Sequence, residues 1–153
     1  MARLKKGRPL PAFQSRLHDG SAISNRDLSS GKVILFFYPQ DNTPTCTEEA
    51  CNLRDHYEDF IKQGYRVFGV SPDSTRKHQN FIKKYRLPYP LISDPSLDLI
   101  NKFGVWGPKK LFGREYDGVL RTTFILRDGI VERVIDEVKA REHSEQILHS
   151  PLE

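Results

Sequence analysis

One continuous apolar run and a second strand-like segment predict two strands in the first half of the chain. The first covers Lys32 to Tyr38 and the second covers Tyr65 to Ser71. Runs that are continuous, β-branched and aromatic are typical of parallel strands covered on both faces. Between them, apolar residues recur at steps of three and four from Cys46 to Gln63, which predicts one helix ended by Gly64. Strand, helix and strand at this spacing predict a right-handed βαβ unit.

The rest of the pattern predicts shorter elements. Asp-Gly pairs at 19–20 and 128–129 each stand between strand-like runs and predict β-hairpins over 12–23 and 120–135. The other expected elements are, in chain order, a capped turn at 24–28, a helix after residues 72–74, a strand at 90–93, a short helix from 94 to 104, an irregular loop at 105–118 and a weak helix at 142–149.

This order of elements predicts an α/β fold. A βαβ half followed by an antiparallel hairpin half gives a central mixed β-sheet flanked by helices, which is the thioredoxin-like arrangement. The N-terminal β-hairpin is an extension of that fold. A length of 153 residues is that of one domain, so we expect a single domain over 1–153.

Composition and charge mainly serve to exclude classes of partner. The chain has 24 basic and 20 acidic residues, and the net charge of +4 is spread along it. Nucleic-acid binding would need a clustered basic face, so we expect none. The longest apolar run has six residues, whereas a membrane span needs about 20. No apolar segment typical of a secretory signal follows the basic N-terminus. We therefore expect a cytoplasmic protein with no membrane partner.

Cysteine and histidine do not form a metal-binding pattern. The chain has two cysteines without a Cys-x-x-Cys spacing, and its five histidines lack finger-like spacing, so we expect no metal site. His78 falls on the apolar face of the second predicted helix and should pack there rather than bind a ligand. The histidines are His18, His56, His78, His143 and His149.

Cys46 lies where the first predicted helix begins, just after the first apolar run. Backbone N–H groups and the helix dipole favour an anion at this place, so we expect the Cys46 thiolate to be stabilised. Cys46 is also part of the apolar stripe, and its side chain should face the protein. We expect Thr45 to be the N-cap and Glu48 to complete a capping box. A sheltered thiolate suits a small electrophile better than a bulky one.

Cys51 follows five residues later, on the polar side of the same helix. In an intact helix the two Cα atoms would be about 8.7 Å apart, whereas a disulfide tolerates at most about 7 Å. Three interpretations stay open from the residues alone. The first is a permanent disulfide, which this geometry opposes. The second is a pair of inert thiols. The third is a redox pair in which Cys46 forms a sulfenic acid and Cys51 condenses with it.

The segment before Cys46 resembles a known family. Pro39-x-x-x-Thr43-x-x-Cys46 is similar to the active-site signature of the peroxiredoxins. The wider run 36–51 resembles the PrxQ subfamily, also called bacterioferritin comigratory protein, in which a second cysteine lies five residues after the first. Gln40 and Thr45 differ from the Lys and Gly that are usual there. Further similar segments are 28–32, 69–73, 104–110 and 121–124.

The resemblance implies a role for five residues. Cys46 would attack the peroxide, and Cys51 would resolve the sulfenic acid as an intramolecular disulfide after the helix unwinds. Thr43 would hold the peroxide and contact the thiolate, and Pro39 would shield it from water. Arg121 would supply a cation for the thiolate and the leaving oxygen.

The same resemblance implies the partners. A thioredoxin, or in some members a glutaredoxin, would reduce the disulfide, and no metal, flavin or haem would be needed. The subfamily also implies a monomer. Two roles stay open for Glu49: it orients Arg121, or it lies on the exposed surface of the helix. A thiol redox sensor using the same cysteines is the rival function, which the sequence does not separate from a peroxidase.

Overall fold

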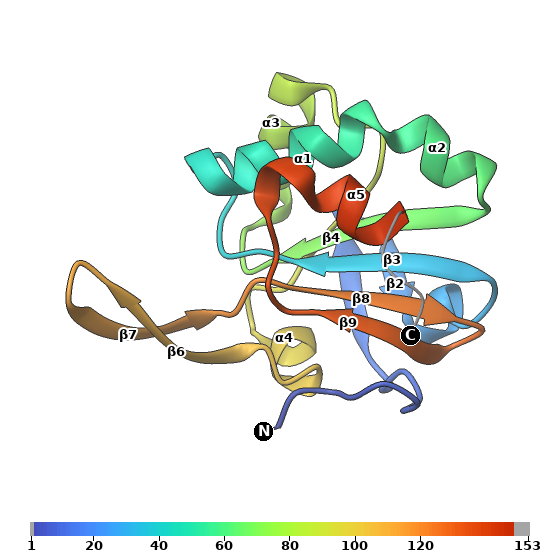
Figure 1. Cartoon of the computed structure of the whole chain (residues 1–153), viewed down its shortest axis with the longest axis horizontal. Helices are drawn as coiled ribbons and strands as arrows, with labels where there is room; N and C mark the ends of the chain where they lie inside the picture. The colour runs from blue at the N-terminus through green and yellow to red at the C-terminus, as the bar shows by residue number, and fades with distance from the viewer. Residues whose placement is uncertain (1, 149–153) are drawn as a thin grey trace.

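The structure is a computed structural model, described for residues 2–148 of the chain (Figure 1). Its strands are β1 (Gln14–Leu17), β2 (Ala22–Ser24), β3 (Lys32–Phe37), β4 (Tyr65–Ser71), β5 (Leu91–Ser93), β6 (Trp106–Leu111), β7 (Arg114–Val119), β8 (Thr122–Arg127) and β9 (Ile130–Ile135). Its α-helices are α1 (Pro44–Asp55), α2 (Tyr57–Lys62), α3 (Thr75–Tyr85), α4 (Asp98–Lys102) and α5 (His143–Leu148), with 3-10 turns η1 (Asn25–Leu28) and η2 (Ala140–Glu142). Within this part of the chain, no helix is long and apolar enough to cross a membrane.

Seven strands form a mixed sheet in the order β2-β1-β5-β4-β3-β8-β9. The strands β3, β4 and β5 are parallel, while β8 pairs antiparallel with β3 and β1 pairs antiparallel with β5. The two hairpins predicted from Asp-Gly pairs are present as β1–β2 and β8–β9. The predicted α/β class, with a central mixed sheet and an N-terminal hairpin, is therefore confirmed.

Strand β3 divides the core into two halves because successive side chains point to opposite faces of a sheet. Ile34 and Phe36 lie on the face of the sheet that is covered by α1, α2, α3 and α5. Leu35 and Phe37 pack against the other face, with residues of α4 and η1. Figure 1 shows α1, α2 and α5 on one side of the sheet and α4 on the other. Burial on both faces is why the β3 sequence is continuously apolar.

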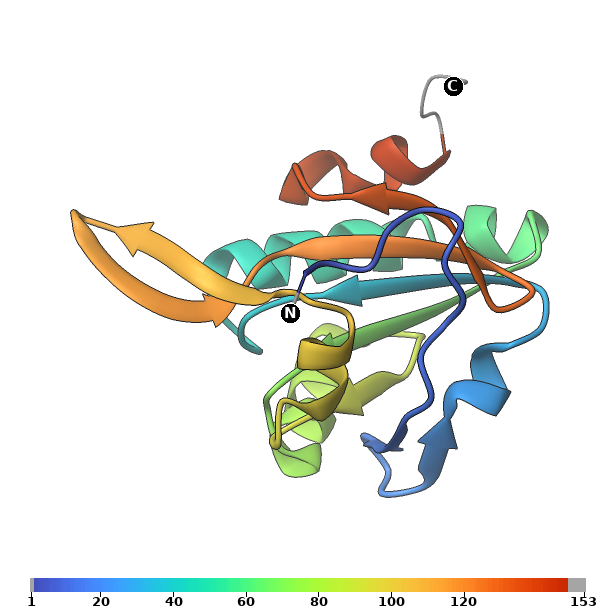
Figure 2. The same cartoon turned by 90° about the horizontal axis from the view of Figure 1, so that it is seen from below.

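The predicted loop over 105–118 is wrong, because β6 and β7 form a separate two-stranded sheet. This arm extends away from the main sheet (Figures 1 and 2). Phe112 and Gly113 both have positive φ, 51° and 80°, as a two-residue hairpin turn requires. Most of the arm is exposed, so no face selects apolar residues, and the alternation that signals a strand is missing.

The single helix predicted over 46–63 is also wrong in its bounds. It is divided into α1 and α2 at His56, whose backbone leaves helical geometry with φ −111° and ψ 15°. Helix α1 begins earlier than expected, with Thr43 as N-cap and Pro44 in the first turn, a position that suits proline. The predicted capping box at Thr45 and Glu48 is therefore absent, and Glu48 forms an ion pair with Arg141 instead.

Other boundaries differ by a few residues. Helix α4 starts at Asp98 rather than near Asp94, although the Asp94 carboxylate still accepts hydrogen bonds from the backbone N–H groups of Leu99 and Ile100, 3.1 and 2.7 Å. The weak C-terminal helix is present as η2 and α5, and its predicted last residue, 149, lies outside the described residues. Strand β8 starts at Thr122, which leaves Arg121 in the link after β7.

Candidate active site

Cys46 occupies the first turn of α1, beyond the carboxyl end of β3. A short loop, 38–43, connects the two elements. This is the edge at which open α/β sheets place their ligands. The Cys46 side chain is buried with Ala50 and Leu53 of the same helix. The prediction that this thiol faces the protein from a helix start is confirmed.

Arg121 contacts both the sulfur of Cys46 and the carboxylate of Glu49. Its Nη2 donates to Cys46 Sγ at 3.1 Å, and its Nη1 donates to Glu49 Oε1 at 2.5 Å. The Glu49 side chain is fully buried, and that of Arg121 is 18% exposed. A planar guanidinium suits this double contact, because its donors lie in a fixed fork. Glu49 therefore orients Arg121, and the alternative of an exposed helix-surface role is excluded.

The charge of Arg121 is maintained despite its burial. Burial alone would lower the pKa of Arg121, but Glu49 and Cys46 beside it outweigh that effect, and the pKa is raised above its usual value. The guanidinium therefore stays protonated next to the sulfur. A fixed cation of this kind favours a thiolate and stabilises negative charge that develops on a leaving oxygen.

Pro39 and Thr43 lie at the two ends of the loop before α1, and both are half-buried. Thr43 is the N-cap, and its hydroxyl donates weakly to the Gln40 carbonyl at 3.4 Å rather than to the Cys46 thiol. The loop thus brings both residues to the start of the helix that carries Cys46. Their roles toward a peroxide stay predictions.

Cys51 is a free, half-buried thiol on the same continuous helix as Cys46. Burial raises the pKa of Cys51, Arg54 acts in the opposite direction, and Asp55 adds to the increase. Cys46 is also a free thiol, so the structure describes the reduced state of both. Among residues 2–148, no cation is bonded to the Cys51 sulfur as Arg121 is to that of Cys46, so the two thiols have different surroundings.

Lys109 places a second cation near Cys46 and Arg121. It belongs to β6 of the arm, and its Nζ donates to the Val119 carbonyl at 2.8 Å. Burial and the neighbouring Arg121 lower the pKa of Lys109, while Cys46 acts in the opposite direction. The sequence resemblance included Lys109 in one of its similar segments but gave it no role.

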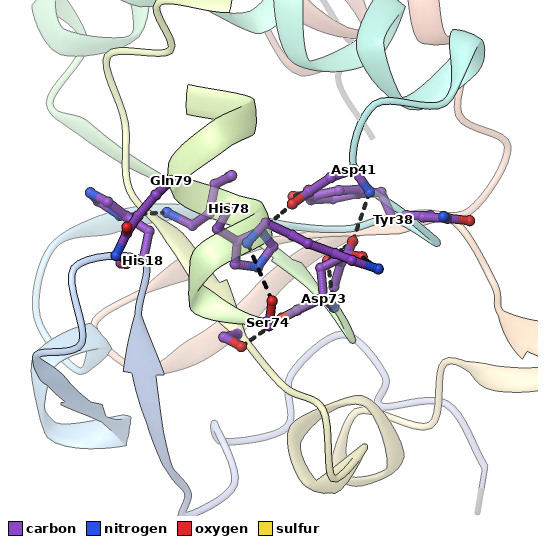
Figure 3. Close-up of polar contacts among 12 residues, drawn as sticks. His18, Tyr38, Asp41, Asp73, Ser74, His78 and Gln79 are labelled. Atoms are coloured by element: carbon purple, nitrogen blue, oxygen red, sulfur yellow. Dashed lines mark hydrogen bonds and ion pairs between the residues drawn. The ribbon is translucent and has the colours of Figure 1, made fainter. Parts of the chain in front are cut away.

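A cluster of three buried residues adjoins the loop and raises the question of a metal. One possible ligand atom from each of Asp41, Asp73 and His78 lies within 4.8 Å of the others. Both ring nitrogens of His78 already have protein partners, namely Asp41 Oδ2 at 2.7 Å and the Ile92 carbonyl at 3.0 Å. Figure 3 shows these contacts. The cluster is therefore internally satisfied, and His78 is packed, as predicted.

The comparisons with known proteins agree with this geometry. The sequence matches the AhpC/TSA family over residues 6–134. It is 39% identical over 146 residues to a putative peroxiredoxin bcp of Coxiella burnetii, covering 95% of this chain and 97% of that protein. The fold is similar to that of Peroxiredoxin Q of Xanthomonas campestris, with a TM-score of 0.84, 32% identity and coverage of 90% and 88% of the two chains.

A second Xanthomonas campestris structure is that of its bacterioferritin comigratory protein, studied for alkyl peroxide reduction activity. It matches with a TM-score of 0.83 and 31% identity, again over 90% and 88% of the two chains. The family match includes Cys46, Cys51 and Arg121. The predicted resemblance and the thioredoxin-like fold are thus confirmed, and the chain belongs to the AhpC/TSA family, in its peroxiredoxin Q and Bcp branch.

Proposed function

We propose that the protein is a thiol-dependent peroxidase that reduces hydrogen peroxide and organic hydroperoxides through Cys46. The observation that supports this best is the contact of 3.1 Å between Arg121 Nη2 and Cys46 Sγ at the start of α1. A cation and a helix N-terminus together favour the thiolate, which is the nucleophilic form of cysteine. The alkyl peroxide activity associated with the Xanthomonas campestris relative supports organic hydroperoxides as substrates.

In the first step, the Cys46 thiolate attacks the terminal oxygen of the peroxide. The sulfur–oxygen bond forms as the oxygen–oxygen bond breaks, so the sulfur is oxidised to a sulfenic acid and the peroxide is reduced. The leaving oxygen takes a proton and departs as an alcohol, or as water from hydrogen peroxide. Arg121 stabilises charge on that oxygen, Thr43 holds the peroxide and Pro39 shields the sulfur from water.

In the second step, the Cys51 sulfur attacks the sulfenic sulfur of Cys46. A disulfide forms, and the sulfenic oxygen leaves as water with the Cys51 proton. An intact α1 keeps the two Cα atoms too far apart for a disulfide, so the helix must unwind locally. Unwinding near a helix end is comparatively easy.

An external dithiol then reduces the disulfide, and we propose thioredoxin for this role, with glutaredoxin as the alternative. The proposed cycle takes place in a monomer in the cytoplasm and uses no metal, flavin or haem. The electrons pass from the dithiol through the disulfide to the next peroxide molecule.

The test is peroxide-dependent oxidation of thioredoxin by the purified protein. We expect turnover with the wild-type chain and none with Cys46→Ser, because no other group in the site replaces the nucleophile. A parallel assay with glutaredoxin identifies the better reductant. Full turnover by Cys46→Ser would refute the peroxidase assignment. Single oxidation of Cys46 without turnover on either reductant would favour a redox sensor.

A further inference from the structure

The loop that leads to Cys46 is attached to the rest of the protein by the side chain of Asp41. Asp41 Oδ1 accepts from the Tyr38 hydroxyl at 2.5 Å, and Oδ2 lies 2.7 Å from His78 Nδ1. The Asp41 backbone N–H donates to Asp73 Oδ2 at 2.7 Å. These contacts join Asp41 to the first residue of the loop, to the segment after β4 and to α3 (Figure 3). All four residues are buried.

The His78 ring connects the loop to the sheet. Its Nε2 faces the Ile92 carbonyl of β5 at 3.0 Å, and a carbonyl only accepts, so Nε2 carries a hydrogen. The contact of 2.7 Å between Nδ1 and Asp41 Oδ2 then needs a second hydrogen, shared by the ring and the carboxylate. Both ends of a fully buried ring are thus fixed, so His78 sets the position of Asp41 relative to β5.

A second attachment lies one residue further along the loop. Asn42 has a left-handed backbone, φ 64°, a conformation that asparagine adopts more readily than most other non-glycine residues. Its Oδ1 accepts from Lys84 Nζ at 3.2 Å and from the Tyr85 hydroxyl at 3.1 Å. Both donors belong to α3. Helix α3 therefore holds the loop at two successive residues, although it contributes nothing to the Cys46 contacts described above.

We propose that His78 is the positioning residue of this loop, and that α3 through His78 presents Pro39 and Thr43 to the peroxide bound at Cys46. The inference rests on the proposed peroxidase function. Pro39 and Thr43 flank the two attached residues, so a shift at Asp41 moves both of them. Arg121 lies outside the loop, and its contacts with Cys46 and Glu49 do not involve the attached residues.

Two reactions of Cys46 separate positioning from general stability. The reaction with peroxide needs the loop, whereas alkylation by iodoacetamide needs only the thiolate. Both rate constants are measured in a Cys51→Ser background, so that one thiol reacts. We expect His78→Phe to lower the peroxide rate constant by about tenfold or more, because small misplacements of binding groups are costly. The alkylation rate should change little.

Three further variants sharpen the test. Asp41→Ala should reproduce the loss. Asp41→Asn should retain most of the rate, because its Oδ1 still accepts from Tyr38 and its Nδ2 donates to Nδ1 of a neutral His78 ring. His56→Phe is the histidine control: its ring nitrogen Nδ1 faces the Asn52 carbonyl at 3.0 Å, at the end of α1 opposite the Cys46 turn, and we expect rates like those of the parent.

Each outcome decides the inference. If His78→Phe does not fold, the comparison of Asp41→Ala with Asp41→Asn carries the same test. Equal peroxide rates in parent, His78→Phe and Asp41→Ala would overturn the inference. So would a parallel loss of both rates, which indicates destabilisation. A parent that does not react with peroxide at all would instead refute the proposed function.

Discussion

Glu49 is the residue whose position gives Arg121 its direction. Its buried Oε1 holds the guanidinium at 2.5 Å, and the same guanidinium reaches the Cys46 sulfur. Its Oε2 is buried without a hydrogen-bond partner, and His143 Nε2 lies 3.6 Å away. Within residues 2–148, Arg121 is the hydrogen-bond donor to this carboxylate, whose charge also acts on the nearby His143.

We expect Glu49→Gln to lower the rate of the Cys46 reaction with peroxide by about tenfold or more, since a neutral amide holds Arg121 less firmly. Stopped-flow measurement of peroxide consumption in a single turnover checks this. Glu48→Gln is the matched control, because the neighbouring glutamate pairs with Arg141 rather than with Arg121. Similar losses in both variants would mean that the effect is not specific to Arg121.

His143 predicts a pH dependence of stability. Burial lowers the pKa of this fully buried histidine below 6.5, Glu49 and Gln146 act in the opposite direction, and Arg121 and Arg133 lower it further. The unfolded chain therefore binds a proton more readily than the folded chain. The free energy of unfolding should be unaffected by His143 above pH 6.5 and should decrease as the pH falls below that value.

Urea unfolding at pH 7.5 and 5.5 tests this expectation. The wild-type protein should lose more stability on acidification than His143→Gln, with a slope of at most about 1.4 kcal/mol per pH unit from one proton. Toward pH 7.5, the free energy of unfolding of both proteins should have the same pH dependence. An identical loss in both would exclude His143 as the source.

At the scale of elements, the proposed cycle places two incompatible requirements on α1. It must be intact to place Cys46 against Arg121, and it must open for Cys51 to reach the Cys46 sulfur. The C-terminal segment adds to its stability, because Asn52 Nδ2 donates to the Arg141 carbonyl and Asn52 Oδ1 accepts from the Ser144 backbone N–H, 2.9 and 2.7 Å. Opening α1 therefore competes with packing against η2 and α5.

Amide hydrogen exchange should show this opening. We expect residues 46–51 to lose protection when the disulfide forms, because their helical hydrogen bonds must break. The amides of α3, which lies outside the segment between the cysteines, serve as an internal control and should be unchanged. Equal protection of 46–51 in the oxidised and reduced protein would contradict helix unwinding.

Removing Cys51 should change the product of the Cys46 reaction with peroxide. Cys46 should consume one equivalent of peroxide and then stop as a sulfenic acid, because no second thiol is present to displace the oxygen. Mass spectrometry and a sulfenic acid trap measure this product. Thioredoxin-linked cycling at the wild-type rate would show that Cys51 is not the resolving cysteine.

At the scale of the whole molecule, the sequence predicts what is buried on both faces and misses what is exposed. Strands β3 and β4 are predicted with nearly correct bounds, because the core selects apolar residues at most of their positions. The β6–β7 arm is missed because solvent on its faces imposes no such selection. The break at His56 is missed because the apolar stripe continues across it into α2.

The site shows the same division. Cys46, Cys51 and Arg121 are predicted as site residues because they fall in segments that resemble the family. The burial of Glu49 depends on contacts with residues far along the chain, and from its own helix it has the appearance of a surface glutamate. Asp41 and His78 are separated by 37 residues, so no local pattern connects them. Contacts of this range are determined by the fold rather than by spacing.

The position of Glu49 between the two cysteines has a consequence for the timing of the cycle. In the proposed cycle, the carboxylate that orients Arg121 lies in the stretch that opens when the disulfide forms, so oxidation would also disrupt the peroxide site. A second peroxide molecule could then react only after a reductant has cleaved the disulfide and α1 has refolded. The stability of one helical turn thereby sets two opposing rates. A stiffer turn prolongs the sulfenic acid and its exposure to overoxidation, and a looser turn leaves fewer molecules ready to react.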